Sequence, residues 1–183
     1  MSGADESLDQ TLQRLIRDVP DFPKPGVMFK DITPLLADHD GLSAVIEALS
    51  RGGRDAAGNV VVDKVVGMEA RGFILAAPVA LALGVGFVPV RKEGRLPSAT
   101  HQVAYSLEYG EATLELHQDG IAAGERVLII DDVLATGGTV AATVQLVEKC
   151  GGVVVGGAVL IELSFLPGRE TIGDLALTAL TTV

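Results

Sequence analysis

Two adjacent carboxylates and a run of small residues follow one apolar segment of the sequence. Residues 126–130 predict a buried strand, Asp131 and Asp132 come directly after it, and residues 135–139 read Ala-Thr-Gly-Gly-Thr before a helical pattern begins. Ligands of open parallel sheets bind at the carboxyl ends of strands. The amide groups at a helix start favour phosphate, and glycines let it approach the backbone. Because two carboxylates suit a pair of sugar hydroxyls, the segment predicts a site for a ribose 5-phosphate.

The same residues have a plainer interpretation, in which the carboxylates end a strand and the glycines start a helix. Either half alone favours that interpretation, whereas the combination at one strand end favours ligand binding. The sequence has no phosphate-binding loop ending in Gly-Lys-Ser or Gly-Lys-Thr, and no Gly-x-Gly-x-x-Gly after a strand.

Positive charge gathers near two other predicted strand ends. Arg91, Lys92 and Arg95 follow one strand closely, and Arg71 follows another. The chain as a whole is acidic, with 14 basic against 24 acidic residues and a net charge of −10. A general nucleic-acid surface is therefore not expected, because phosphate backbones demand a basic face. Taken alone the basic cluster suits a solvated loop, but beside a ribose phosphate site it suits contact with an anionic ligand.

The elements that must position these residues follow from the apolar pattern. The 183 residues, 48% of them apolar, suffice for one domain with a sizeable core. Val-rich runs alternate with Ala/Leu-rich segments, so we expect an α/β fold with an open, mostly parallel twisted sheet and helices on both faces. Residues 22–34 are expected to form an ordered loop. Helices are predicted over 8–19, 42–49, 71–83 and 137–150, strands over 64–68, 86–90, 126–130, 153–161 and 175–180, and a projecting antiparallel ribbon over 103–106 and 113–116.

Residues 72–90 carry no charge, and their number approaches that of a membrane span. Two prolines and two glycines interrupt them, so a buried helix followed by a buried strand is expected instead. Cys150 is the one cysteine, which excludes an internal disulfide, and the polar residues 1–10 predict no signal peptide. We therefore expect a cytoplasmic protein.

The segment from Asp131 to Thr139 resembles the phosphoribosyl-pyrophosphate (PRPP) signature of the type I phosphoribosyltransferases. Further segments are similar to those of one family among them, the adenine phosphoribosyltransferases. Residues 21–34 (Asp-Phe-Pro-Lys-Pro-Gly-Val-Met-Phe-Lys-Asp-Ile-Thr-Pro) resemble its base-binding segment, and residues 67–73 (Gly-Met-Glu-Ala-Arg-Gly-Phe) its pyrophosphate loop. Val-Arg-Lys-Glu-Gly-Arg-Leu-Pro at 90–97 and Tyr-Ser-Leu-Glu-Tyr-Gly at 105–110 resemble its mobile active-site loop. The likeness runs from Asp21 to Arg169, and these segments are more particular to the family than the PRPP signature.

The resemblance implies a type I phosphoribosyltransferase fold and transfer of the phosphoribosyl group from PRPP to adenine, giving AMP and pyrophosphate in purine salvage. Residues 1–183 would form one domain, with an N-terminal helix and base-binding hood over 1–34, a core over 60–165 and a mobile active-site loop over 95–116. The Mg²⁺ of the reaction would be held mainly by the substrate, with no metal site on the protein. A homodimer is implied, with no nucleic-acid or membrane partner.

The resemblance also assigns individual residues. Glu108 resembles the family's catalytic carboxylate, which manages the ring proton of the purine as general acid or base. A cis peptide bond is implied between Glu69 and Ala70, and Lys30 stands where the family often has arginine. PRPP contacts are implied for Asp131, Asp132, Ala135, Thr136, Gly137, Gly138, Thr139, Arg71, Arg91, Lys92, Arg95 and Tyr109, and adenine contacts for Val27, Met28, Phe29, Lys30 and Val133.

Several alternatives stay open from the residues alone. Glu108 could be a solvated side chain on the ribbon, like Glu111 and Glu115, and Phe29 could be an ordinary core aromatic. A phosphoribosyltransferase for 6-oxopurines would share the carboxylate pair and the glycine loop, but the segments at 21–34 and 105–110 argue against it. A PRPP-sensing regulator that binds nucleic acid would need a basic face, which the net charge of −10 does not favour.

Overall fold

The computed structural model describes residues 7–106 and 111–183 of the chain. The chain divides into two compact units, residues 1–47 and residues 48–183, which we describe in turn. The organisation as one domain with a hood, a core and a mobile loop stays a prediction.

The first unit consists of short helices and one β-hairpin. Ser7 begins the first helix with a capping box, in which the side chains of Ser7 and Gln10 each bond the other residue's backbone N–H. The two strands pair antiparallel along their length. The elements are α1 (Leu8–Leu15), β1 (Arg17–Pro20), β2 (Met28–Asp31), α2 (Thr33–Ala37) and α3 (His39–Ser50), which runs on into the second unit.

The helix predicted over 8–19 is wrong beyond Leu15, and the loop predicted over 22–34 contains strand β2 and the start of α2. Ile16 already has extended backbone angles, φ −93° and ψ 119°, and Pro20 has no N–H with which to continue a helix. Residues 17–20 pair instead with 28–31. The apolar spacing of a segment does not show that it pairs with a later strand. For this reason the spacing predicts a longer helix than the structure has.

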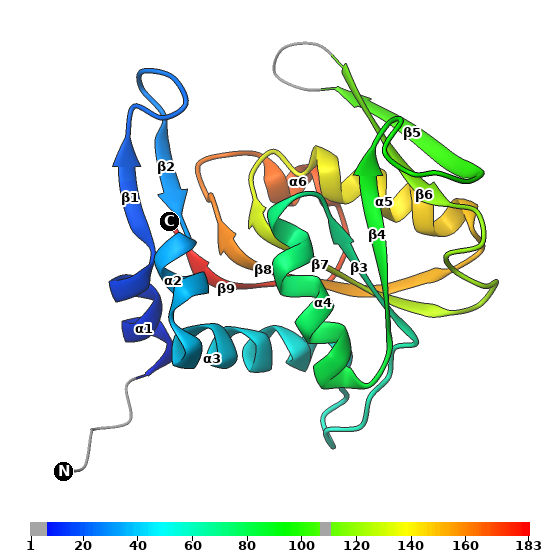
Figure 1. Ribbon diagram of the computed structural model, residues 1–183, viewed down its shortest axis with the longest axis horizontal. Helices are drawn as coiled ribbons and strands as arrows, with labels where there is room; N and C mark the ends of the chain where they lie inside the picture. The colour runs from blue at the N-terminus through cyan, green and yellow to red at the C-terminus, as the bar shows by residue number, and fades with distance from the viewer. Residues whose placement is uncertain (1–6, 107–110) are drawn as a thin grey trace. The chain divides into compact units, whose positions relative to one another are not determined.

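The second unit is a seven-stranded sheet with helices, and it confirms the predicted α/β fold (Figure 1). The strand order is β5-β6-β4-β3-β7-β8-β9; the five strands from β4 to β9 are parallel, and β5 and β6 add an antiparallel edge. After a short 3-10 turn (Arg51–Gly53), the elements are β3 (Lys64–Met68), α4 (Arg71–Leu83), β4 (Gly86–Lys92), β5 (Thr100–Ser106), β6 (Glu111–His117), β7 (Arg126–Leu134), α5 (Gly138–Lys149), β8 (Val153–Glu162), α6 (Gly168–Ile172) and β9 (Leu177–Thr182).

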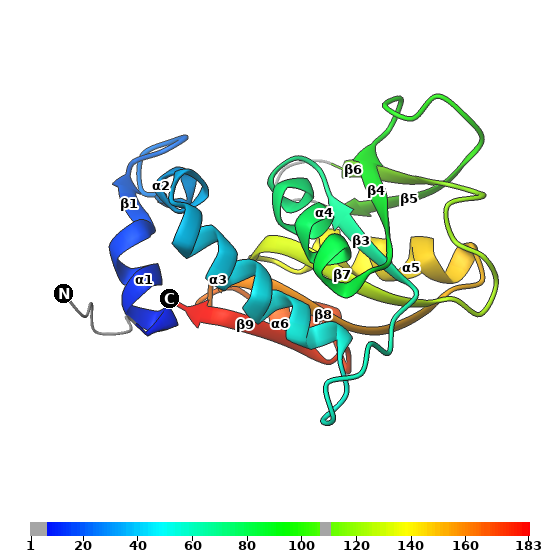
Figure 2. The same ribbon diagram turned by 60° about the horizontal axis from the view of Figure 1, so that its bottom comes forward.

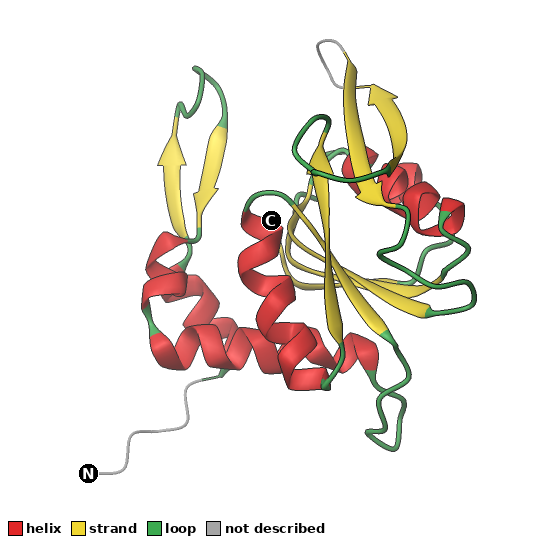
Figure 3. Cartoon of the chain, turned by 45° about the vertical axis from the view of Figure 1, so that its right-hand side comes forward, coloured by secondary structure: helices red, strands yellow, loops and turns green. Residues whose placement is uncertain are grey.

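Helices α4 and α5 cover opposite faces of this sheet (Figure 3). α4 joins β3 to β4 and α5 joins β7 to β8, in opposite directions across the sheet, and right-handed crossovers then place them on opposite faces. Burial agrees, because Gly67 lies against Ala76 of α4 while Val66 and Met68 belong to the core cluster that α5 covers. The strand order reverses between β3 and β7, so the carboxyl ends of these strands form the crevice in which such sheets bind ligands.

The bounds of β3 and α4 confirm the predictions over 64–68 and 71–83. β7 is longer than predicted, because its ladder with β8 continues past the apolar run, with Asp131 opposite Val159 and Leu134 opposite Glu162. The two carboxylates therefore lie within the strand. The uncharged segment 72–90 is helix α4 and strand β4, as expected, and none of the helices in the described ranges has the length and apolar character to cross a bilayer.

The antiparallel ribbon is confirmed as β5 and β6, and it packs on α5. Lys149 Nζ donates to the carbonyl of Gln102 at 2.7 Å, and Thr139 Oγ1 donates to the hydroxyl of Tyr105 at 3.4 Å. Figure 2 shows the segment between β4 and β5 as a wide loop that leaves the end of β4 and returns to the ribbon. Residues 107–110, with the predicted Glu108 and Tyr109, lie outside the described residues.

Candidate active site

Asp131 and Asp132 are buried side by side in β7, with 8% and 7% of their surface exposed. Asp131 Oδ1 accepts the backbone N–H of Asp132 at 2.9 Å. Asp132 Oδ2 forms an ion pair with Arg71 Nε at 2.5 Å, but this buried oxygen accepts no hydrogen bond from the described residues. The pair therefore keeps unused acceptor capacity at the start of α4.

The electrostatics of the pair disfavour full ionisation. Burial raises the pKa of Asp131 well above its ordinary value, and the charge of Asp132 raises it further. The N–H of Asp132 and the charge of Arg71 oppose this shift only in part. A buried carboxylate with a perturbed pKa in a crevice is typical of a functional site, and a ligand rich in hydroxyl donors would satisfy it.

The loop after β7 leads into the first turn of α5, where no side chain caps the amide groups. Gly137 has φ 82°, and a side chain there would meet the carbonyl oxygen of Gly168 at 2.6 Å, so only glycine fits. Uncapped amides at a helix start attract phosphate. A cavity of about 50 Å³ lies at this loop and is lined by Val133, Leu134, Ala135, Thr136, Gly137, Thr139 and Val140.

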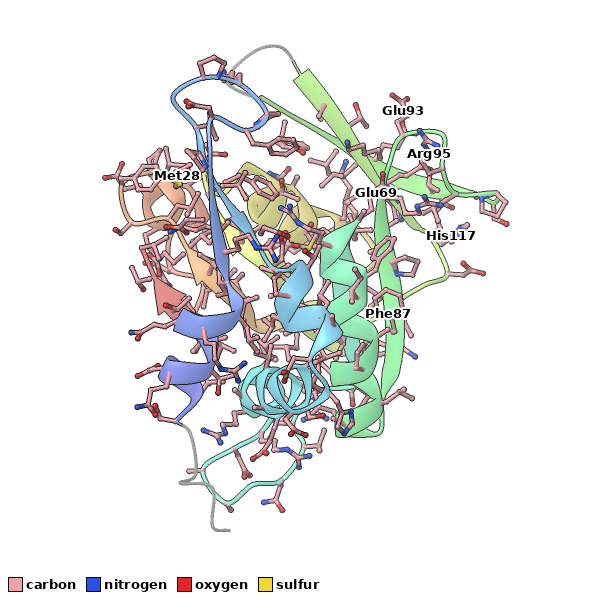
Figure 4. All side chains as sticks on the ribbon, turned by 60° about the vertical axis from the view of Figure 1, so that its left-hand side comes forward. Met28, Glu69, Phe87, Glu93, Arg95 and His117 are labelled. Carbon is pink, nitrogen blue, oxygen red and sulfur yellow. The ribbon has the colours of Figure 1, made fainter. Side chains whose placement is uncertain are left out.

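The cis peptide bond predicted between Glu69 and Ala70 is present, between β3 and α4. The Glu69 carboxylate accepts Arg91 Nε at 2.8 Å, and Arg91 Nη1 also donates to the carbonyl of Arg95 at 3.1 Å. The predicted pyrophosphate loop and the basic segment after β4 are thus joined by hydrogen bonds. Figure 4 shows Glu69 and Arg95 at the same end of β4.

Lys92 and Arg95 have exposed side chains, and neither is paired with a carboxylate within the described part of the chain. Both cations can therefore meet an anionic ligand. Sequence analysis placed Glu69 in the predicted pyrophosphate loop but gave its carboxylate no role. It missed Glu115, which was grouped with solvated glutamates but is only 2% exposed. No signal in the sequence indicates that Glu115 is buried, because the residues that cover its side chain belong to a loop and not to its own strand.

The residues predicted to bind adenine, Val133 apart, lie in the hairpin of the first unit. Phe29 is half-buried and packs edge-to-face on Phe22, with ring centroids 5.0 Å apart and an interplanar angle of 73°. Lys30 Nζ donates to Asp18 at 2.7 Å across the hairpin, and Met28 is 49% exposed. Phe29 is therefore part of a half-exposed aromatic pair rather than a core residue, and the ammonium of Lys30 holds the hairpin together.

No three His, Cys, Asp or Glu side chains within 7–106 and 111–183 converge to hold a metal ion. The carboxylate oxygens of β7 are of the kind that Mg²⁺ prefers, so the crevice suits a substrate that brings the ion with it.

Comparison with known proteins identifies the family. The phosphoribosyl transferase domain matches residues 33–169. An adenine phosphoribosyltransferase of a Nocardioides species is 68% identical over 169 residues, which cover 92% of this chain and 91% of that protein. The chain belongs to the adenine phosphoribosyltransferase family.

Solved structures of adenine phosphoribosyltransferases share this fold. That of Thermoanaerobacter pseudethanolicus has a TM-score of 0.90 at 45% identity, covering 97% of this chain and all (100%) of that one. That of Saccharomyces cerevisiae, complexed with an imino-altritol bisphosphate and adenine, has a TM-score of 0.88 at 37% identity, covering 93% and 96%. The predicted type I phosphoribosyltransferase fold is confirmed.

The second unit brings most of the predicted family residues to one edge of its sheet, at the carboxyl ends of β3, β4 and β7. The roles of these residues stay predictions, as do those of Glu108 and Tyr109. The residues at this edge are Arg71, Arg91, Lys92, Arg95, Asp131, Asp132, Val133 and the loop 135–139.

Proposed function

We propose that the chain transfers the 5-phosphoribosyl group of PRPP to adenine, the reaction of purine salvage. The bond between the anomeric carbon and the pyrophosphate oxygen breaks, and its electron pair leaves with pyrophosphate. A ring nitrogen of adenine bonds to the same carbon and loses its proton, so the products are AMP, pyrophosphate and a proton. The observation that carries this function is the buried Asp131–Asp132 pair beside the uncapped start of α5, in a chain of this family.

The ribose 5-phosphate of PRPP would bind in the crevice of β7. Its phosphate would accept hydrogen bonds from the amides and hydroxyls of residues 135–139. Its two ring hydroxyls would donate to Asp131 and Asp132, and hydrogen bonds to ionised carboxylates are among the stronger ones. One of them would give Asp132 Oδ2 the donor that it lacks.

The pyrophosphate of PRPP would meet the basic residues, namely Arg71, Arg91, Lys92 and Arg95. Positive groups fixed where the leaving group gains charge stabilise the transition state more than the ground state. Mg²⁺ bound to the phosphate oxygens of PRPP would add further neutralisation of the leaving group.

Glu108 is proposed to take the ring proton of adenine, with Tyr109 in contact with PRPP. The support is the Tyr-Ser-Leu-Glu-Tyr-Gly segment at 105–110. Replacing Glu108 with Gln should lower kcat by roughly 100-fold, within the range of general acid–base catalysis. The dissociation constant of PRPP should not change, because the side chain acts on the base. A Glu108→Gln variant with the wild-type kcat would remove Glu108 from the mechanism.

The adenine contacts proposed are Val27, Met28, Phe29 and Lys30, and separately Val133. Phe29 offers a half-buried ring, braced by Phe22, for stacking on a purine. The ammonium of Lys30 is paired with Asp18, so Lys30 would contribute its backbone rather than its charge. That assignment also explains how lysine can stand where the family often has arginine.

A homodimer and a cytoplasmic location are further proposals. The family resemblance supports the dimer, and the apolar α4, on which Leu81 is 82% exposed, is the candidate interface. The free thiol of Cys150 suits a reducing compartment.

A panel of bases tests the proposed function. The protein is incubated with PRPP, Mg²⁺ and adenine, hypoxanthine, guanine or xanthine in turn, and both nucleotide and pyrophosphate are measured. AMP and pyrophosphate in equal amounts from adenine alone is the expected result. Product from a 6-oxopurine instead would overturn the adenine assignment, and no product from any base would overturn the enzymatic role.

A further inference from the structure

Glu115 is an unusual residue of the antiparallel edge, because it is a carboxylate with only 2% of its surface exposed. Its neighbours Leu114 and Leu116 belong to the core cluster on the α5 side. Since side chains alternate along a strand, Glu115 points to the other face of β6. The segment after β4 covers it there, as its hydrogen bonds show.

The carboxylate of Glu115 binds the backbone of the basic segment. Its Oε1 accepts the N–H groups of Arg95 and Leu96, each at 2.8 Å. Its Oε2 has the longer contacts, to Thr100 Oγ1 and Gln102 Nε2, each at 3.4 Å. A single buried side chain thus fixes the loop between β4 and β5.

The surroundings of Glu115 favour the ionised form of its carboxylate. Burial alone would raise its pKa, but the backbone N–H groups of Leu96, Arg95 and Gly94 outweigh burial, so the pKa is lowered. Hydrogen bonds to a charged acceptor are about twice as strong as neutral ones. The loop is therefore held by strong bonds rather than by incidental contact.

Arg95 is held from its other side as well. Its carbonyl accepts Arg91 Nη1 at 3.1 Å, and Arg91 is itself bonded to Glu69 at 2.8 Å. Gly94 supplies the positive φ of 78° that turns the chain here. The backbone of Arg95 is thus fixed at both its N–H and its C=O, while its side chain stays exposed.

We propose that Glu115 is a positioning residue for the pyrophosphate of PRPP, which it serves by fixing residues 94–96 so that the side chain of Arg95 faces the ligand. This role rests on the proposed function. Glu115 touches no substrate itself and acts through the backbone of Arg95. A loop ordered in advance lowers the entropy cost of ligand binding, and without Glu115 the ligand would have to order it.

The ligand contrast that tests this role is PRPP against AMP, because AMP has the ribose 5-phosphate but no pyrophosphate. Dissociation constants for both, with Mg²⁺, are measured by calorimetry on the wild type and on Glu115→Ala. The variant should bind PRPP about tenfold more weakly, the worth of roughly one charge-assisted hydrogen bond. Its affinity for AMP should not change, whereas general damage to the fold would weaken both ligands.

Two further variants serve as controls for Glu115→Ala. Glu115→Gln keeps an acceptor oxygen without the charge and should bind PRPP with intermediate affinity, which also serves if Glu115→Ala does not fold. Glu125→Ala is the matched control, because Glu125 also accepts a backbone N–H, that of Ala122 at 2.8 Å, but next to the first residue of β7, away from the site. It should leave both affinities unchanged.

A double-mutant cycle with Arg95→Ala decides how Glu115 acts. If Glu115 works through Arg95, the loss of PRPP affinity in the double variant should be clearly smaller than the two single losses combined. Fully additive losses, equal losses for PRPP and AMP, or unchanged PRPP affinity would each overturn the positioning role while wild-type AMP synthesis still stands. A wild type that neither binds PRPP nor makes AMP would instead refute the proposed function together with this role.

Discussion

Buried carboxylates occur in two regions of the second unit, and they differ in what surrounds them. Asp131 and Asp132 in β7 face each other and Arg71, with one oxygen lacking a hydrogen-bond donor, and the pKa of Asp131 is raised. Glu115 in β6 is even less exposed, yet two backbone N–H groups bind one of its oxygens and its pKa is lowered.

The difference agrees with the two proposed roles, a ligand site for Asp131 and Asp132 and a positioning role for Glu115. A buried carboxylate oxygen that lacks a hydrogen-bond donor costs stability, and such perturbed groups gather at functional sites, where a ligand can supply the donor. A buried carboxylate with its donors in place stabilises the fold and orders what it binds. The three carboxylates are alike in how little of their surface is exposed. They differ in the hydrogen-bond donors that surround them.

The largest effect should follow from Asp131→Asn. Without the second negative charge the pair should bind the ribose hydroxyls poorly, and kcat/KM for PRPP should fall by roughly 100-fold, as for loss of a buried charged partner. The free energy of unfolding should nevertheless rise, by about 1 kcal/mol at neutral pH, because the variant no longer buries a carboxyl whose pKa is raised by folding. Steady-state kinetics and urea unfolding measure the two effects. A variant that loses stability along with activity would contradict the ligand-site assignment.

A smaller effect on PRPP binding, together with a loss of stability, is expected for Gly137→Ala. The new side chain would require the left-handed φ of 82° and would meet the Gly168 carbonyl at 2.6 Å. Gly124→Ala is the matched control, with the same φ of 82° and nothing within 4 Å. Both variants should lose about 1 kcal/mol to backbone strain, but Gly137→Ala should lose more and should also bind PRPP more weakly. Equal PRPP affinity in the two variants would mean that the loop does not hold the phosphate.

The pH dependence of stability should have opposite signs for the two regions. The pKa of Glu115 is lowered on folding, so its contribution is present above its ordinary value of 4.5 and is lost as the pH falls through the folded value. The pKa of Asp131 is raised, so its ionisation destabilises the fold as the pH rises from 3.8 through the folded value. Urea unfolding across the acid range should show wild type more stable than Glu115→Gln and less stable than Asp131→Asn, with both differences shrinking on acidification. If both variants were more stable than wild type, or both less stable, the predicted contrast between the two regions would be wrong.

The smallest effect is expected for Asp63→Asn. Asp63 lies near the amino ends of β3 and β7 and makes two hydrogen bonds of 2.9 Å to the Arg126 guanidinium, which lowers its pKa to about 2. This half-buried carboxylate, already paired with Arg126, lies away from the crevice, so kcat/KM should not change and the melting temperature should fall only slightly. An NMR titration should find the low pKa in the wild type. A large loss of activity would show that ligand binding reaches the other end of the sheet.

Much of the fold could be predicted because its signals are local. The apolar run and the glycine after it gave α4 its bounds, and a buried strand before Asp131 was clear from composition. The hairpin of β1 and β2 could not be predicted, because the pairing of two short strands leaves no mark in the apolar pattern of either segment. For the same reason the predicted strand over 126–130 is shorter than β7, whose pairing with β8 continues through residues 131–134.

In the candidate site, too, local signals predicted some residues and not others. The carboxylate pair, the glycine loop and the basic cluster were visible as residue types at strand ends, and the cis bond at Glu69–Ala70 followed from the family resemblance. Glu115 could not be found, because a glutamate between two leucines on a strand that is apolar on one face normally faces water on the other. The loop that buries it is set by contacts between β4, β5 and β6 that no local pattern encodes.

The central claim is that the carboxylate pair of β7, in which Asp132 Oδ2 lacks a hydrogen-bond donor, receives the ribose of PRPP. A crystal structure with PRPP and Mg²⁺, without a base, tests it most directly. We predict that the two ribose hydroxyls lie within hydrogen-bond distance, at most about 3.2 Å, of Asp131 and Asp132, with the 5-phosphate on the amides of residues 136–139. Ribose hydroxyls bound elsewhere, with Asp132 still engaged only by Arg71, would contradict it.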